Sequence, residues 1–94
     1  MPIFSIQYTY APEQAELRDE MRPAHREWLG AGEKAGDVLV AGPYTAGDGA
    51  LLLIRAVDEA AAAEYLSGDP FVEAGAIAAT RIDEWRAVFG PFEN

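Results

Sequence analysis

Two residues of this chain could together move protons: the single histidine, His25, and Asp69 of the segment Asp69-Pro70-Phe71. Histidine is the side chain whose protonation changes closest to neutral pH, which suits it to general acid–base catalysis. A carboxylate that accepts a hydrogen bond from one imidazole nitrogen fixes the tautomer and leaves the other nitrogen free to exchange a proton with a substrate. Whether His25 and Asp69 meet in space therefore decides the functional interpretation.

Both residues also have a purely structural interpretation. A histidine on an apolar helix face is often a core residue satisfied by a backbone carbonyl. An aspartate followed by proline is a good helix N-cap with proline at the first helical position. The two roles of Asp69 are compatible, since one carboxylate oxygen could cap a turn while the other orients His25.

The element that must position His25 is a long helix predicted from Pro12 to about Lys34. One face of it is apolar and includes the histidine, at helical spacing: Leu17, Met21, His25, Trp28, Leu29 and Gly32. Pro23 removes a backbone donor and predicts a kink or a break near Arg22. Gly36 closes the segment.

The remaining segments predict an α+β fold. Residues 3–10, 38–41, 50–57 and 77–86 have strand patterns, while 59–67 is an alanine-rich helix with Asp58 as its N-cap, followed by a short turn from Asp69 to Gly75. The order is β-α-β-β-α-β, the ferredoxin-like arrangement: a four-stranded antiparallel sheet with two main helices on one face. We expect one domain over residues 1–94.

The strand at 50–57 is apolar on both faces, so it needs cover on both sides. Two helices cover only one face of a four-stranded sheet. An identical subunit is the simplest cover for the other, and we expect a homodimer joined through its sheet faces.

Composition excludes several classes of function. A formal net charge of −9 argues against binding nucleic acid or an anionic membrane surface. Cysteine is absent, and one histidine with scattered carboxylates does not predict a metal site. Phosphate-binding motifs for a nucleotide are missing, so no cofactor is expected. No secretory signal or membrane-span pattern is recognisable, and we expect a cytoplasmic protein.

The order and spacing of several short motifs resemble the YCII-related (YciI-like) family of small dimeric α+β-barrel proteins. The matching parts cover nearly the whole chain: the helix segment 22–29, Gly36, Gly42-Pro43, Gly47-Asp48-Gly49, Asp69-Pro70-Phe71 with Ala74-Gly75, and a strand that ends at Trp85. The resemblance implies an active site made of the helix histidine and the aspartate of the Asp-Pro-Phe segment, here His25 and Asp69. Some relatives are enzymes that act on small ring compounds, including a dehydrochlorinase.

Further site residues are chosen by position and chemistry. Tyr44 is the preferred donor to a developing oxyanion, with Tyr8, Tyr10 and Ser5 as alternatives on strands. We expect Trp28 and Phe71, with the adjacent Pro70, to wall the pocket. Arg22 could bind a substrate carboxylate, although a solvated helix arginine is the favoured interpretation.

Three functions follow from these residues. The first is a small-molecule enzyme in which His25 and Asp69 transfer protons during elimination, isomerisation or hydrolysis. The second is a non-catalytic dimeric protein that binds a ligand or serves as an accessory. The third is a cofactor-free monooxygenase-like protein. An imidazole nitrogen exposed in a pocket favours the enzyme, whereas a filled cavity with both nitrogens bonded to protein favours the accessory role.

Overall fold

The computed structural model describes residues 1–93 and has the predicted ferredoxin-like α+β fold. Its elements are β1 (Ile3–Thr9), the 3-10 turn η1 (Pro12–Gln14), α1 (Ala15–Ala35), β2 (Val38–Pro43), β3 (Gly49–Arg55), α2 (Glu59–Leu66), α3 (Pro70–Glu73) and β4 (Ala79–Trp85). The four strands form one antiparallel sheet in the order β2-β3-β1-β4. The single domain expected over 1–94 stays a prediction, and Asn94 lies outside the described residues.

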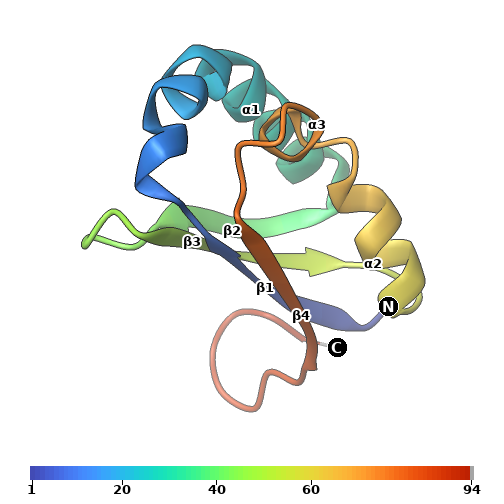
Figure 1. Ribbon diagram of the computed structural model, residues 1–94. Coiled ribbons are helices and arrows are strands. Elements are labelled where there is room, and N and C mark those ends of the chain that lie inside the picture. The colour runs from blue at the N-terminus through green and yellow to red at the C-terminus, as the bar shows by residue number, and fades with distance from the viewer. Residues whose placement is uncertain (94) are drawn as a thin grey trace.

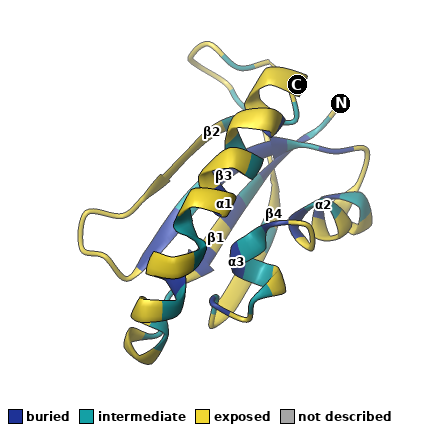
Figure 2. Cartoon of the chain, turned by 90° about the horizontal axis from the view of Figure 1, so that it is seen from above, coloured by how far each residue is buried: buried dark blue, intermediate teal, exposed yellow. Residues whose placement is uncertain are grey.

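The helices lie together on one face of the sheet (Figure 1). Alternation along the two central strands points apolar side chains at them: Phe4, Ile6 and Tyr8 from β1, and Ala50, Leu52 and Ile54 from β3. From the helix side, Figure 2 shows an exposed outer surface on α1 above buried β1 and β3. The core therefore sits between α1, α2 and the centre of the sheet.

Helix α1 is continuous through Pro23, so the predicted break into two pieces is wrong. Pro23 is exposed, and the Asp19 carbonyl that loses its helical donor can be hydrated instead. The end of the helix follows the prediction. Gly36 has φ +88°, and the Asp37 N–H donates to the Gly32 carbonyl at 2.9 Å, which forms a Schellman motif.

The opposite face of the sheet carries apolar side chains with no helix over them. Val40 and Trp85 are 39% and 38% exposed there. The C-terminal arm, residues 87–93, loops beneath part of this face (Figure 1), and the Arg55 guanidinium donates to the Glu93 carbonyl at 2.9 Å. Phe89 on the arm remains 94% exposed. Among the described residues, no helix has the length and apolar character needed to span a membrane.

Candidate active site

His25 and Asp69 meet as predicted, although 44 positions separate them in sequence. The Nδ1 atom of His25 lies 2.7 Å from Oδ1 of Asp69. His25 comes from the middle of α1, and Asp69 is the N-cap of α3, which packs beside α1. The Asp69 side chain is fully buried and the His25 side chain is 11% exposed. A buried contact this short is a charge-assisted hydrogen bond when the carboxylate is ionised.

Asp69 accepts hydrogen bonds from two further donors. The prediction gave one carboxylate oxygen to the cap and the other to His25, but the structure divides them differently. Oδ1 accepts both the His25 contact and the Phe71 N–H, at 3.0 Å, so one oxygen caps α3 and orients the imidazole. Oδ2 is thereby left for the Tyr8 hydroxyl, which donates to it at 2.8 Å. Three donors from α1, α3 and β1 therefore stabilise one buried carboxylate.

Tyr8, considered in the sequence analysis only as an alternative oxyanion donor, instead holds the Asp69 carboxylate from behind. It projects from β1 toward the helices and is 1% exposed. Burial raises the pKa of its hydroxyl above the ordinary value, and the charge of Asp69 and the hydrogen bond to it raise that pKa further. Tyr8 thus stays protonated and keeps donating. The available signal was an amphipathic ring on an apolar strand face, because a buried tyrosine hydroxyl needs a partner.

The His25 ring is fixed on its flat side as well. It stacks on Phe71 with the ring centroids 3.8 Å apart and the planes 5° from parallel. Because Asp69 engages Nδ1, the other nitrogen, Nε2, is the one available to a ligand. Within residues 1–93, Nε2 has no hydrogen-bond partner.

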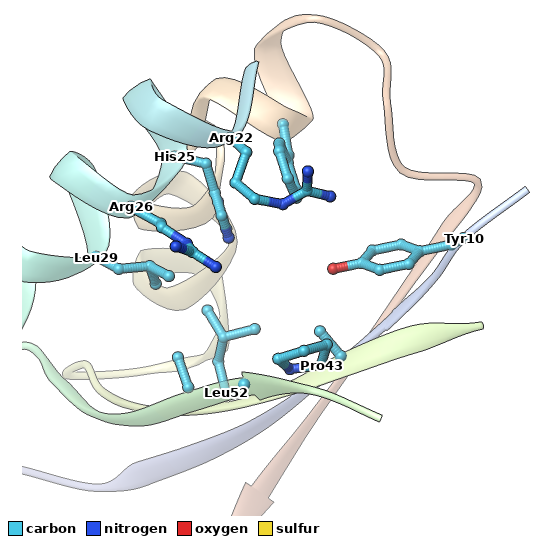
Figure 3. A pocket seen from close by; sticks show the side chains of 11 residues that line it. Tyr10, Arg22, His25, Arg26, Leu29, Pro43 and Leu52 are labelled. Atoms are coloured by element: carbon cyan, nitrogen blue, oxygen red, sulfur yellow. The ribbon is translucent and has the colours of Figure 1, made fainter. Parts of the chain in front are cut away.

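The imidazole lines a cavity of about 340 Å³ between α1 and the sheet. The tip of the His25 ring points into this space (Figure 3). The walls come from elements far apart in sequence: Tyr10, Arg22, Arg26, Leu29, Ala41, Gly42, Pro43, Ala50, Leu52 and Phe71 beside His25. The site thus combines a general acid–base group, held from behind by a carboxylate, with room for a small molecule in front of it.

Comparison with known protein families identifies a match for this chain. The model of the YCII-related domain matches residues 3–86. The chain belongs to that family. Among curated proteins, none matches the sequence significantly.

Two solved structures share the fold of this YCII-related chain. One is the 5-chloro-2-hydroxyhydroquinone dehydrochlorinase TftG of Burkholderia phenoliruptrix, in complex with 2,5-dihydroxybenzoquinone, with TM-score 0.79 and 24% identity over 89% of this chain and 93% of that one. The other, from Bacteroides thetaiotaomicron, is assigned as an antibiotic biosynthesis monooxygenase, with TM-score 0.61 and 16% identity over 99% and 94%. Both identities are low, so these likenesses establish the fold.

Of the other residues predicted for the site, the structure brings Arg22 and Phe71 to the cavity and leaves three outside it. Trp28 faces α2 and packs on Tyr65 with centroids 4.9 Å apart. Tyr44 lines a separate depression with Val40 and Leu51. Pro70 occupies the first position of α3, where it begins the helix.

A β-bulge explains the position of Tyr44. Simple alternation from Val38 would place Tyr44 on the helix-facing side of the sheet. The register of β2 shifts between Val38 and Val40, so Pro43 turns toward the cavity and Tyr44 away from it.

Two polar residues of the cavity were missed or only partly recognised from the sequence. Arg26 was given no role, and Tyr10 was named only as an alternative to Tyr44. Arg26 lies one helical turn after Arg22 and lines the cavity with it. Tyr10 contributes its ring and hydroxyl to the wall. Within residues 1–93, no three histidine or acidic side chains are grouped closely enough to hold a metal ion.

Proposed function

We propose that this protein is a small-molecule enzyme in which His25 acts as general base and general acid and Asp69 orients it. One observation carries the proposal: Asp69 engages Nδ1 at 2.7 Å while the same imidazole lines a cavity of about 340 Å³. That volume falls at the lower end of ligand-binding pockets, roughly 300–1,000 Å³. A small metabolite, such as one with a single ring, is the size of substrate that fits.

The proposed chemistry is a proton transfer at Nε2. With Nδ1–H donating to Asp69, the neutral imidazole has its lone pair on Nε2, where it can accept a proton from a substrate in the cavity. The buried carboxylate then stabilises the imidazolium. The same nitrogen returns the proton to a leaving group or to a neighbouring atom. Elimination, isomerisation and hydrolysis all use this step.

The fold neighbour TftG supports elimination as the first reaction to test. Its name describes a dehydrochlorination, which removes a proton and a chloride from a ring compound. In this chain Nε2 of His25 would accept the proton, and chloride would leave into solvent. The lack of a hydrogen-bond partner for Nε2 within residues 1–93 supports an enzyme over an accessory protein.

The test is a reaction assay with matched variants. Wild-type protein is incubated in D₂O with 5-chloro-2-hydroxyhydroquinone and with a panel of hydroxylated quinones and cyclic ketones. Chloride release and deuterium incorporation are followed. We expect turnover of at least one compound and a loss of about 10²–10⁴-fold in His25→Gln, as is usual when a general base is removed.

Asp58→Asn is the matched control for Asp69→Asn, because both residues are helix N-caps and only Asp69 contacts the histidine. Asp69→Asn should lose most turnover, and Asp58→Asn should retain it. Turnover that survives His25→Gln would overturn the proposal. Binding of panel compounds near His25 without turnover would replace it with the ligand-binding or accessory role.

We also propose that two copies of the chain pair through the sheet face that the helices leave uncovered. Val40 and the half-buried Leu51 line an apolar depression there, which a second copy would shield from water. Sedimentation equilibrium at micromolar concentration should give twice the 10.2 kDa chain mass, and Leu51→Glu should shift it toward the monomer. A wild-type monomer at that concentration would contradict this pairing.

A further inference from the structure

The charge around the cavity is opposite to the charge of the whole chain. The protein carries sixteen acidic side chains and only seven Lys and Arg residues. Yet Arg22 and Arg26 line the cavity, and none of the residues that line it is acidic. Arg18, one turn earlier on α1, lies over the Tyr10 ring with its guanidinium 4.3 Å from the centroid. Three of the seven Lys and Arg residues therefore lie one helical turn apart, in the first half and middle of α1.

We infer that this cavity selects small molecules with an anionic oxygen group, a carboxylate or an ionised enol or phenol, and that Arg26 and Arg22 bind this group beside His25. The inference rests on the proposed function in taking the His25 cavity as the ligand site. It goes further in stating what the ligand must carry.

Arg26 is the principal anion-binding residue. Its guanidinium points into the space in front of the His25 tip (Figure 3). Within residues 1–93 it forms no ion pair, so its charge is not neutralised by a neighbouring carboxylate. A guanidinium has five N–H donors in a planar fork that matches two oxygens of a carboxylate.

Arg22 is partly engaged elsewhere. One of its terminal nitrogens donates to Asp19 at 2.7 Å, and Asp19 is 70% exposed on the outside of α1. That contact uses one of several guanidinium donors. The remaining N–H groups are available to the ligand, so Arg22 adds a second, weaker contact.

Tyr10 completes the polar wall from the opposite side. Its hydroxyl points toward Arg26 and His25 across the cavity (Figure 3). Burial raises the pKa of Tyr10 above its ordinary value, although the nearby Arg18 and Arg22 charges act in the opposite direction. The hydroxyl is therefore a neutral donor at physiological pH, which suits an anionic oxygen.

The floor of the cavity is apolar and takes the rest of the ligand. Leu29 from α1, Leu52 and Ala50 from β3, and Pro43 from β2 form it. A charged group at the arginines and a hydrocarbon ring on this floor would place the ring carbons next to Nε2. When His25 removes a proton there, the negative charge that develops on the substrate lies close to two arginines, which stabilise it.

The experiment compares benzoate with its neutral isostere benzamide. The single histidine gives one Hε1–Cε1 signal in a ¹H–¹³C spectrum, so the probe's effect on the site is read without ambiguity. Dissociation constants are measured by titration for the wild type, Arg26→Gln and Arg22→Gln. Lys34→Gln is the matched control, since it removes one positive charge from the exposed end of the same helix.

We expect benzoate to bind about tenfold more tightly than benzamide, the size of effect typical of a charge-assisted hydrogen bond. Arg26→Gln should abolish this preference, Arg22→Gln should reduce it, and Lys34→Gln should preserve it. Benzoate affinity should also fall as salt is added, because salt ions screen the attraction between the carboxylate and the arginines where the cavity is open to solvent. Circular dichroism establishes that each variant is folded.

Equal affinity for the two probes, no detectable binding of benzoate, or an unchanged preference in Arg26→Gln would overturn the inference. These results are distinct from a failure of the proposed function. Turnover that depends on His25 without any anion preference would leave the enzyme proposal standing. Anion selection at Arg26 with no turnover of any panel compound would leave the anion site standing and remove the catalytic role of His25.

Discussion

Asp58 and Asp69 perform the same local task and differ in everything else. Each is the N-cap of a short helix and accepts a backbone N–H with its side chain: Asp58 from Ala61 at 2.8 Å, and Asp69 from Phe71 at 3.0 Å. Asp58 is exposed and makes no other side-chain hydrogen bond among the described residues, whereas Asp69 is fully buried and also engages His25 and Tyr8.

The comparison separates what a helix start requires from what a proton-transfer site requires. A capping carboxylate needs one acceptor oxygen and can remain in water. Orienting an imidazole requires a carboxylate oxygen that is aimed at the ring nitrogen and held in place by further donors. Asp69 obtains this because α3 begins under α1, which places the start of a four-residue helix against the histidine.

The largest difference is expected when each capping aspartate is replaced by alanine. Asp58→Ala should lower the free energy of unfolding by about 1 kcal/mol, the usual cost of a lost cap. Asp69→Ala should lower it by about 3 kcal/mol, because it also leaves the buried Tyr8 hydroxyl and His25 Nδ1 without their partner. Urea unfolding at a fixed protein concentration measures both. Equal losses would show that Asp69 is only a cap.

The contrast also shows what sequence reasoning could and could not reach. Both caps and the apolar face of α1 follow from local patterns. The His25–Asp69 pair follows from the family resemblance, and the fold order makes the contact reachable. The Tyr8–Asp69 hydrogen bond does not, since it requires knowing that β1 is central and that the end of α2 lies above it. Tyr44 was misplaced relative to the cavity because the bulge in β2 changes the alternation, and no residue pattern marks the bulge.

The second prediction concerns Tyr8 and the dependence of stability on pH. The raised pKa of Tyr8 means that the folded chain keeps this proton above pH 10, where the unfolded chain releases it. Above pH 10 the folded state then binds more protons than the unfolded state. The contribution of Tyr8 to the free energy of unfolding is therefore fully present below pH 10 and is lost as pH rises beyond it.

Tyr8→Phe should therefore flatten this alkaline loss of stability, while costing about 1–3 kcal/mol at neutral pH because Asp69 Oδ2 loses its donor. Tyr44→Phe is the control, because Tyr44 is 38% exposed and lies outside the Asp69 network. Urea unfolding between pH 7 and pH 11 measures both effects. An unchanged alkaline slope in Tyr8→Phe would contradict the buried Tyr8–Asp69 contact.

A smaller effect is expected on the tautomer of the histidine. In the neutral ring, donation to Asp69 places the proton on Nδ1, whereas a neutral histidine side chain in water favours the form with the proton on Nε2. The ¹⁵N shifts of His25 in alkaline solution should report a protonated Nδ1 in the wild type and in Asp58→Ala. Asp69→Ala should shift the population toward protonated Nε2. A protonated Nε2 in the wild type would show that Asp69 does not set the tautomer.

The smallest effect concerns Pro70, which begins α3 in the position that Glu59 holds in α2. Pro70 does not line the cavity, so its role in the structure is to restrict the chain that follows Asp69. Pro70→Ala should cost about 0.4–1 kcal/mol by enlarging the conformational freedom of the unfolded chain. Benzoate affinity and the His25 tautomer should stay at wild-type values, because Asp69, Tyr8 and Phe71 keep their contacts. A change in either would mean that the restricted backbone of Pro70 sets the orientation of the Asp69 carboxylate. Asp58 and Asp69 would then differ in their local backbone as well as in their surroundings.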